Sequence, residues 1–148
     1  NGIIKLKMIN VNDIKNIDND FELNTGSPHF VKFVEMLKDY KVFENGNKIR
    51  NSASYCEEGI NVNFVEELAE KEIFVRTYER GVEDETFSCG TGVTAAALVY
   101  LKGKNQPSVQ VKVLGGNLKV YAEQHGETFK NIWLEGPAKQ VFKGKINL

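Results

Sequence analysis

Alternating apolar and polar residues predict strands over most of this chain. Residues 4–8 alternate between apolar side chains and lysines, a spacing typical of a half-buried strand. By the same criterion we expect strands over residues 21–25, 30–34, 60–65, 73–78, 108–114, 118–123, 129–134 and 140–146. The Asn- and Asp-rich residues 16–20 predict a loop. Residues 115–117, Gly-Gly-Asn, predict a hairpin turn, because glycine and asparagine accept a positive φ.

Two segments have helical patterns of different strength. Residues 93–101 are apolar all round, which is typical of a helix buried on every side. They follow a glycine-rich turn and end at Lys102-Gly103, a cationic last turn with a glycine stop. Residues 42–51 have a weaker helical pattern that Gly46 interrupts. Together these elements predict one α+β domain over residues 1–148, with a curved, mainly antiparallel sheet around one central buried helix.

Composition and charge narrow the class of protein. A chain of 148 residues that is 41% hydrophobic can form one sizeable core. Its 19 basic and 20 acidic residues are interspersed, which argues against nucleic-acid and membrane-surface partners. The first residues lack the apolar stretch of a secretory signal, and no apolar run reaches the ~20 residues that span a bilayer. We therefore expect a cytoplasmic protein in which Cys56 and Cys89 are free thiols.

The strongest chemical signal is Cys89, where a loop is predicted to become a helix. It is followed by Gly90-Thr91-Gly92. The free N–H groups and positive end of a helix stabilise a thiolate, and the same groups can bind a carboxylate. A thiolate beside a carboxylate-binding turn is suited to abstracting a proton next to a carboxylate. The plain alternative is a buried cysteine acting as a small hydrophobe.

Four segments of the chain form a set with Cys89: Arg76 to Gly81 with Glu85-Thr86 and Cys89 to Gly92, Thr25 to His29, Gly59 to Phe64, and Trp133 to Ala138. They resemble, in that order, the carboxy-terminal signature, the Gly-Asn-Pro-His element, the asparagine-bearing strand and the closing strand of the diaminopimelate epimerase family. The resemblance covers essentially the entire chain but only half of the enzyme. Family enzymes have two similar domains that each supply one catalytic cysteine, with the substrate between them. The chain resembles the carboxy-terminal domain, so an amino-terminal domain is its implied partner.

This resemblance implies a cofactor-independent epimerase that interconverts LL- and meso-diaminopimelate for lysine and peptidoglycan precursor synthesis. Inverting an α-carbon requires two groups on opposite faces in opposite protonation states. Cys89 would be one of them. Cys56 lacks a glycine-rich turn and cannot replace the second thiol, so the isolated chain is expected to be inactive.

The resemblance also implies roles for residues around the thiol. Gly90 and Thr91 would present N–H groups to the reacting carboxylate. Glu79 would accept hydrogen bonds from the substrate ammonium, and Arg80 would offer a planar fork to a carboxylate. Asn61 would hold the distal end of the substrate.

Two further residues qualify this picture. His29, together with Glu79, would tune the cysteine pair. Ser27 stands where the family commonly has a binding asparagine, which leaves the distal specificity open. No metal is expected, because the two histidines and two cysteines are not at ligand spacing.

Each assignment has a simpler alternative. His29 could be structural, Glu79 and Arg80 could form an exposed ion pair, and Asn61 could bond a neighbouring loop, with Asn63 competing for its role. For the whole protein, the alternatives are a related racemase of another amino acid and a non-catalytic carboxylate-binding module. Self-association into a homodimer also stays open.

Overall fold

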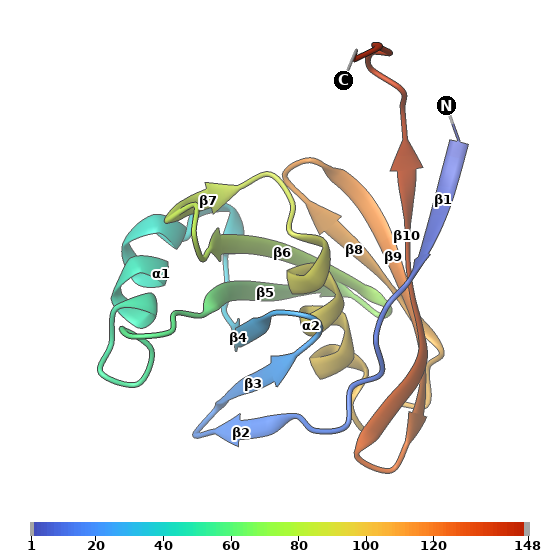
Figure 1. The fold of residues 1–148 in the computed structure, drawn as a ribbon. Helices are drawn as coiled ribbons and strands as arrows, with labels where there is room; N and C mark the ends of the chain where they lie inside the picture. The colour runs from blue at the N-terminus through green and yellow to red at the C-terminus, as the bar shows by residue number, and fades with distance from the viewer. Residues whose placement is uncertain (1, 147–148) are drawn as a thin grey trace.

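The strands form a single mixed sheet that curves around one helix (Figure 1). The computed structural model describes residues 2–146. Its strands are β1 (Gly2–Lys7), β2 (Lys15–Ile17), β3 (Asp20–Asn24), β4 (Pro28–Phe33), β5 (Asn61–Ala69), β6 (Glu72–Glu79), β7 (Asp84–Thr86), β8 (Ser108–Val113), β9 (Gly116–His125) and β10 (Thr128–Ala138). Its helices are the 3₁₀ turn η1 (Leu37–Asp39), α1 (Val42–Arg50) and α2 (Gly90–Leu101). None of them has the length and apolarity of a membrane-spanning helix.

Two parallel pairings place the two helices. The sheet order is β1-β10-β9-β8-β6-β5-β4-β3-β2, with β7 also paired to β6. Strands β4 and β5 are parallel, as are β6 and β8, and the other described pairings of named strands are antiparallel. Parallel neighbours need a crossover connection, and here one crossover contains α1 and the other α2. The predicted mainly antiparallel sheet is therefore confirmed.

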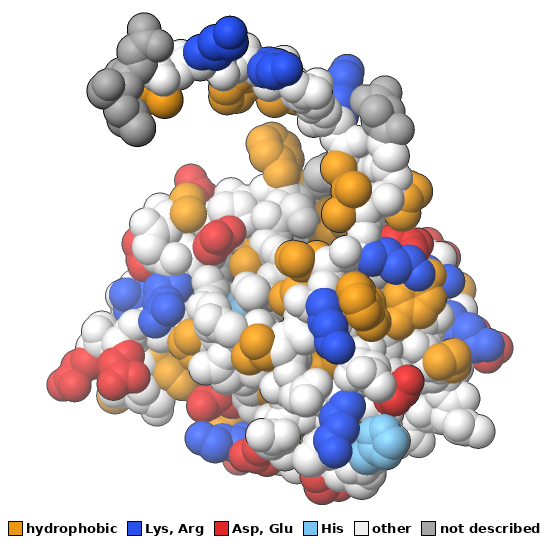
Figure 2. Space-filling view, turned by 45° about the vertical axis from the view of Figure 1, so that its right-hand side comes forward, with side chains coloured by type: hydrophobic (Ala, Val, Ile, Leu, Met, Phe, Trp, Pro, Cys, Tyr) orange, Lys and Arg blue, Asp and Glu red, His pale blue; other side chains and the backbone are white. Residues whose placement is uncertain are grey.

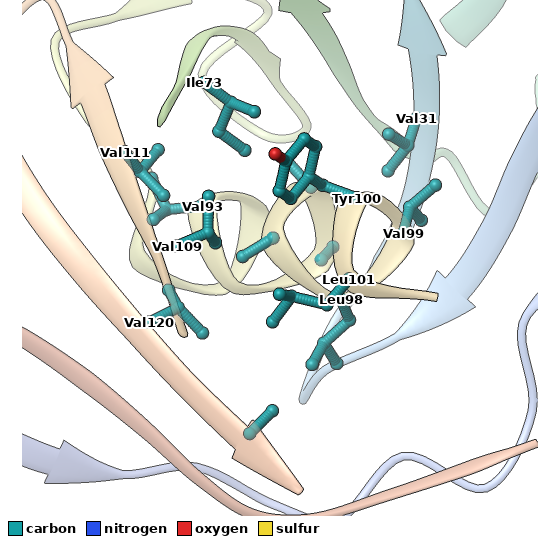
Figure 3. Packing of buried hydrophobic residues seen from close by; sticks show 14 of the residues in the cluster. Val31, Ile73, Val93, Leu98, Val99, Tyr100, Leu101, Val109, Val111 and Val120 are labelled. Carbon is teal, nitrogen blue, oxygen red and sulfur yellow. The ribbon is translucent and has the colours of Figure 1, made fainter. Parts of the chain in front are cut away.

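Helix α2 is the centre of the larger core. Every residue from Gly92 to Leu101 is buried, and the helix contacts β3 to β6 and β8 to β10. Figure 3 shows Val31, Ile73, Val109, Val111 and Val120 arranged around it. The prediction of a central buried helix is thus confirmed.

Helix α1 covers the opposite face of the sheet. There it meets a second apolar cluster that includes Val62, Phe64 and Tyr78. A Cβ atom at Gly46 would overlap the side chain of Tyr78, so the glycine allows the helix to approach β6 closely. The helix predicted over residues 42–51 is confirmed as α1, and it continues through Gly46, which only interrupts the sequence pattern.

The termini differ most from the predictions. Residues 139–146 form no strand, although their apolar alternation predicted one. The pairing of β10 with β1 ends at Ala138 opposite Gly2, and the pairing with β9 ends at Glu135 opposite Lys119, so neither ladder continues past Ala138. Strand β1 forms as predicted but is exposed along its whole length rather than half-buried. Strands β1 and β10 stand side by side at one side of the molecule in Figure 1.

Two loop predictions also change. The expected loop at residues 16–20 contains the short strand β2 and its turn into β3. The hairpin between β8 and β9 turns at residues 114 and 115, slightly earlier than predicted, because Val113 pairs with Gly116.

Candidate active site

Three strand ends meet at one edge of the sheet, close to the start of α2. His29 near the start of β4 is the register partner of Asn61 at the start of β5. The pairing of Val62 with Tyr78 places Asn61 opposite Glu79 at the end of β6. Side chains directly opposite each other point to the same face of a sheet. The strand register therefore gathers three of the predicted site residues on the face that carries α2.

Cys89 occupies the N-cap position of α2, where the sequence pattern had placed it. Its backbone is extended, with φ −120° and ψ 109°, and the residue is 8% exposed. The Sγ atom lies 3.5 Å from the Thr91 hydroxyl. A Cβ atom at Gly90 would lie 3.2 Å from the Leu134 side chain, so the glycine lets β10 pass close to this turn. The first helical N–H groups have no intrahelical acceptor, which leaves them for an anion.

Glu79 and Arg80 are adjacent in sequence but have different surroundings. The Glu79 carboxylate accepts a 2.8 Å hydrogen bond from the Thr86 hydroxyl. Arg80 is exposed, and its Nη1 donates to the Glu58 carbonyl at 3.0 Å. The turn that follows is held by Glu83, whose pKa is lowered mainly by the hydrogen bond it accepts from the Gly81 N–H.

Asn61 connects the three strand ends. Its Nδ2 donates to Ser27 Oγ at 2.8 Å and to the Pro28 carbonyl at 2.9 Å. Its Oδ1 accepts the main-chain N–H of Arg80 at 3.0 Å. One lone pair of Oδ1 remains for another donor. The arrangement supports positioning of Ser27 and Arg80 by Asn61 as much as the distal binding role predicted for it.

His29 and Asn63 are completely buried behind this edge. Asn63 Nδ2 lies 3.0 Å from His29 Nδ1 and also 3.0 Å from the Phe30 carbonyl. The Asn63 Oδ1 accepts the Thr77 hydroxyl at 3.0 Å. Burial, assisted by the positive charge of Arg80, lowers the pKa of His29 from 6.5 to about 4. The ring is therefore neutral at physiological pH. Because Asn63 has no exposed surface, it is an internal residue and not one that binds a ligand at the surface.

The neutral, buried His29 should make stability depend on pH. Its folded pKa is lowered, so between pH 6.5 and 4 the unfolded chain binds more protons than the folded one. The free energy of unfolding should therefore fall as the pH drops through this window, by about 3 kcal/mol in all. Urea unfolding at several pH values measures it. His29→Gln should lose this part of the slope, whereas His125→Gln, at an exposed histidine, should keep it.

Two threonines join the site without having been singled out from the sequence. Thr86 holds Glu79, and the Thr25 hydroxyl donates to the Thr91 carbonyl at 2.8 Å, which ties the loop before β4 to the first turn of α2. Thr86 lies within the signature that carried the resemblance, as Glu79 does. That shared membership was the signal in the sequence that could have identified Thr86.

The remaining candidates lie apart from this site. Cys56 is exposed on the loop after α1, with its Sγ 3.7 Å from the Ala53 carbonyl, and both cysteines are free. Within residues 2–146, no group of three or more His, Cys, Asp or Glu side chains is arranged to hold a metal ion.

Comparison with known proteins identifies the family. The sequence profile described as "Diaminopimelate epimerase" matches residues 21–141. The chain belongs to the diaminopimelate epimerase family. The diaminopimelate epimerase of Flavobacterium psychrophilum is 47% identical over 148 residues, which are 99% of this chain and 58% of that protein. The one from Aquifex aeolicus is 44% identical over 128 residues, covering 84% of this chain and 45% of the relative. The chain thus spans about half the length of the diaminopimelate epimerases it matches.

Solved structures support the fold of this family member. A hydroxyproline epimerase from Agrobacterium vitis, solved with bound trans-4-hydroxy-L-proline, superposes with a TM-score of 0.60 at 14% identity, over 90% of this chain and 49% of that one. A PhzF-family phenazine biosynthesis protein from Bacillus anthracis gives a TM-score of 0.51 at 15% identity, over 83% and 38%. At these identities the likeness shows the fold alone, and it confirms an α+β domain of the diaminopimelate epimerase type.

Proposed function

We propose that this chain is the carboxy-terminal catalytic domain of a cofactor-independent epimerase that interconverts LL- and meso-diaminopimelate. The observation that carries the proposal is Cys89 at the N-cap of a buried helix, beside a row of strand-end residues from β4, β5 and β6. The membership of the family supports the same activity. The free thiols fit a reducing cytoplasm, where lysine and peptidoglycan precursors would be made.

The geometry divides the chemistry among few groups. Cys89 would abstract the α-proton as a thiolate in one direction and return one as a thiol in the other. The N–H groups of Gly90 and Thr91 would hold the reacting carboxylate as charge builds on it. Glu79, fixed by Thr86, would accept hydrogen bonds from the substrate ammonium. Arg80 would bind a carboxylate with the part of its fork that Glu58 does not use.

The second proton carrier would come from a partner domain. An amino-terminal domain with its own cysteine would account for the half of the relatives' length that this chain does not span. The exposed apolar side chains support such a partner. Phe87, two residues before Cys89, is 78% exposed, and Val141, Phe142 and Ile146 are each at least 80% exposed. Figure 2 shows apolar side chains along the segment that stands away from the body of the molecule. A homodimer through the same surface is the alternative partner.

A second candidate function is a racemase acting on another amino acid. Ser27 stands at a position where the resemblance implies an asparagine, and its Oγ already accepts a bond from Asn61. A serine reaches less far toward a distal carboxylate than an asparagine would.

The third candidate, a carboxylate-binding module without catalysis, would require that no second thiol meets Cys89.

Assays of the complete protein separate these candidates. Purified full-length protein should exchange the α-proton of LL-diaminopimelate for solvent deuterium and produce the meso form, and it should leave proline and hydroxyproline unchanged. Residues 1–148 alone should give no inversion, since one thiol cannot serve both faces. Turnover of only the other amino acids would refute the diaminopimelate activity, and inversion by the isolated chain would refute the two-domain mechanism.

A further inference from the structure

Strand β7 has little main-chain support for the residue that it carries. It is three residues long and pairs with β6, along the part of β6 that the ladder with β8 does not reach. Yet β7 carries Thr86, whose hydroxyl holds the Glu79 carboxylate at 2.8 Å. A two-stranded ladder this short is only marginally stable by itself. The position of Glu79 therefore depends on what else fixes β7.

An ion pair fixes β7 to β6 on the α1 face of the sheet. Arg76 donates through Nε to one oxygen of Glu85 and through Nη2 to the other, both at 2.6 Å. The two side chains are 13% and 19% exposed, so salt and water screen the pair weakly. Two parallel hydrogen bonds from a guanidinium to a carboxylate also fix their relative orientation. The pair therefore holds the middle residue of β7 in place.

Arg76 is itself held by main-chain carbonyls. Its Nη1 donates to the carbonyl oxygens of Leu37, Lys38 and Tyr40 at 2.8, 3.2 and 3.1 Å. Among the described residues, the Arg80 side chain makes one hydrogen bond, to the Glu58 carbonyl. Of these two arginines of the family signature, Arg76 is thus bound within the protein, whereas Arg80 has donors left for a ligand.

The two sides of β7 have different tasks. The register pairs Thr77 with Thr86 and Tyr78 with Glu85. Because successive side chains of a strand point to opposite faces, Glu85 lies on the α1 face and Thr86 on the α2 face, with Glu79. Both side-chain contacts run diagonally across β6 and β7. If the ion pair is lost, β7 can move away from β6 and take Thr86 from Glu79.

The chain that follows β7 is secured separately. The Gly115 N–H donates to the Phe87 carbonyl at 2.9 Å, which ties the segment before Cys89 to the hairpin between β8 and β9. A loosened β7 should therefore disturb Glu79 more than Cys89. The expected effect is weaker substrate binding with little change in proton transfer.

We propose that Arg76 and Glu85 form a positioning pair that fixes Glu79 through Thr86, so that the Glu79 carboxylate meets the substrate ammonium. The pair itself does not touch the substrate. The ammonium contact of Glu79 rests on the function proposed above, whereas the support of β7 by the pair does not.

Glu85→Gln in the complete protein tests the pair. The amide keeps the size of the side chain but turns one acceptor toward Arg76 into a donor. Amide hydrogen exchange of residues 84–86 should become roughly tenfold faster, and that of residues 93–101 should stay unchanged. The KM for LL-diaminopimelate should rise about tenfold, which corresponds to one weakened hydrogen bond to a charged group, with kcat within about threefold. Unchanged exchange or an unchanged KM would overturn the proposal.

A double-mutant cycle shows whether the pair acts through Thr86. Thr86→Val removes the hydroxyl and should raise KM by a similar factor. If Thr86 is the link, Glu85→Gln added to Thr86→Val should change KM by less than about twofold. Two independent factors that multiply would refute positioning through Thr86.

Asp20→Asn is the matched control for a lost ion pair. Asp20 accepts a 2.8 Å hydrogen bond from Lys32, which joins β3 to β4 instead of β6 to β7. This variant should keep the wild-type KM and the wild-type exchange of residues 84–86. A similar rise of KM in the control would mean a general loss of stability and would refute the specific role. Faster exchange in Glu85→Gln, in a protein whose wild type does not invert diaminopimelate, would refute the proposed function alone.

Discussion

Replacement of Cys89 by serine in the complete protein should lower the rate of diaminopimelate inversion by roughly 10²–10⁴-fold, the usual contribution of a positioned acid or base. The hydroxyl fills almost the same space but releases its proton far less readily than a thiol. Cys89 is 8% exposed at the N-cap, so the substitution leaves the packing of α2 intact. Deuterium exchange at the α-carbon measures the loss, and circular dichroism checks the fold.

Cys56→Ser is the matched control for this experiment. Cys56 is exposed, and its Sγ contacts only the nearby Ala53 carbonyl at 3.7 Å among the described hydrogen bonds. The variant should invert diaminopimelate at the wild-type rate. Equal losses in both variants, or unfolding of Cys89→Ser, would show that Cys89 is a structural cysteine.

Gly46→Ala should destabilise the protein by about 1–3 kcal/mol, the range typical of overpacked cores. On helix propensity alone, the change would stabilise α1 by about 1 kcal/mol. The added Cβ overlaps the side chain of Tyr78, which is completely buried, so α1 must move away from β6. The sign of the change therefore reports the close contact between helix and sheet. Urea unfolding of the two proteins measures it.

Lys48→Ala provides the comparison on the same helix. Lys48 is exposed on α1, so the free energy of unfolding should change by no more than about 0.5 kcal/mol. A Gly46→Ala protein more stable than the wild type would mean that α1 does not pack against Tyr78 as described.

Local sequence patterns predicted where helices and strands lie better than they predicted how those elements are paired and buried. Residues 93–101 are apolar on every side, which is typical of a helix buried all round, so the central helix could be predicted. The alternation in residues 4–8 and 140–146 gave no information about which strand would pair with each segment or which residues would bury its apolar face. Strand β1 has a partner but no cover within the described chain, and residues 139–146 have neither.

In the candidate site too, the features set by local sequence could be predicted, and those set by strand register could not. The helix start at Cys89 could be predicted because a glycine-rich turn precedes an apolar run. The row of His29, Asn61 and Glu79 depends on a parallel register between β4 and β5, which no local pattern encodes. The competition between Asn61 and Asn63 was visible from the sequence. Which of them is fully internal depends on how closely α2 approaches β5.

The enclosure of α2 has a consequence for how the enzyme would close over its substrate. Helix α2 packs against strands on nearly every side, so it cannot slide or tilt independently of the sheet, and Cys89 at its N-cap keeps a fixed position in this domain. If the partner domain proposed above carries the second thiol, the two proton carriers would approach each other by movement of the domains as units. Under that proposal, a stiff linker between the two domains would slow turnover without altering the chemistry at Cys89.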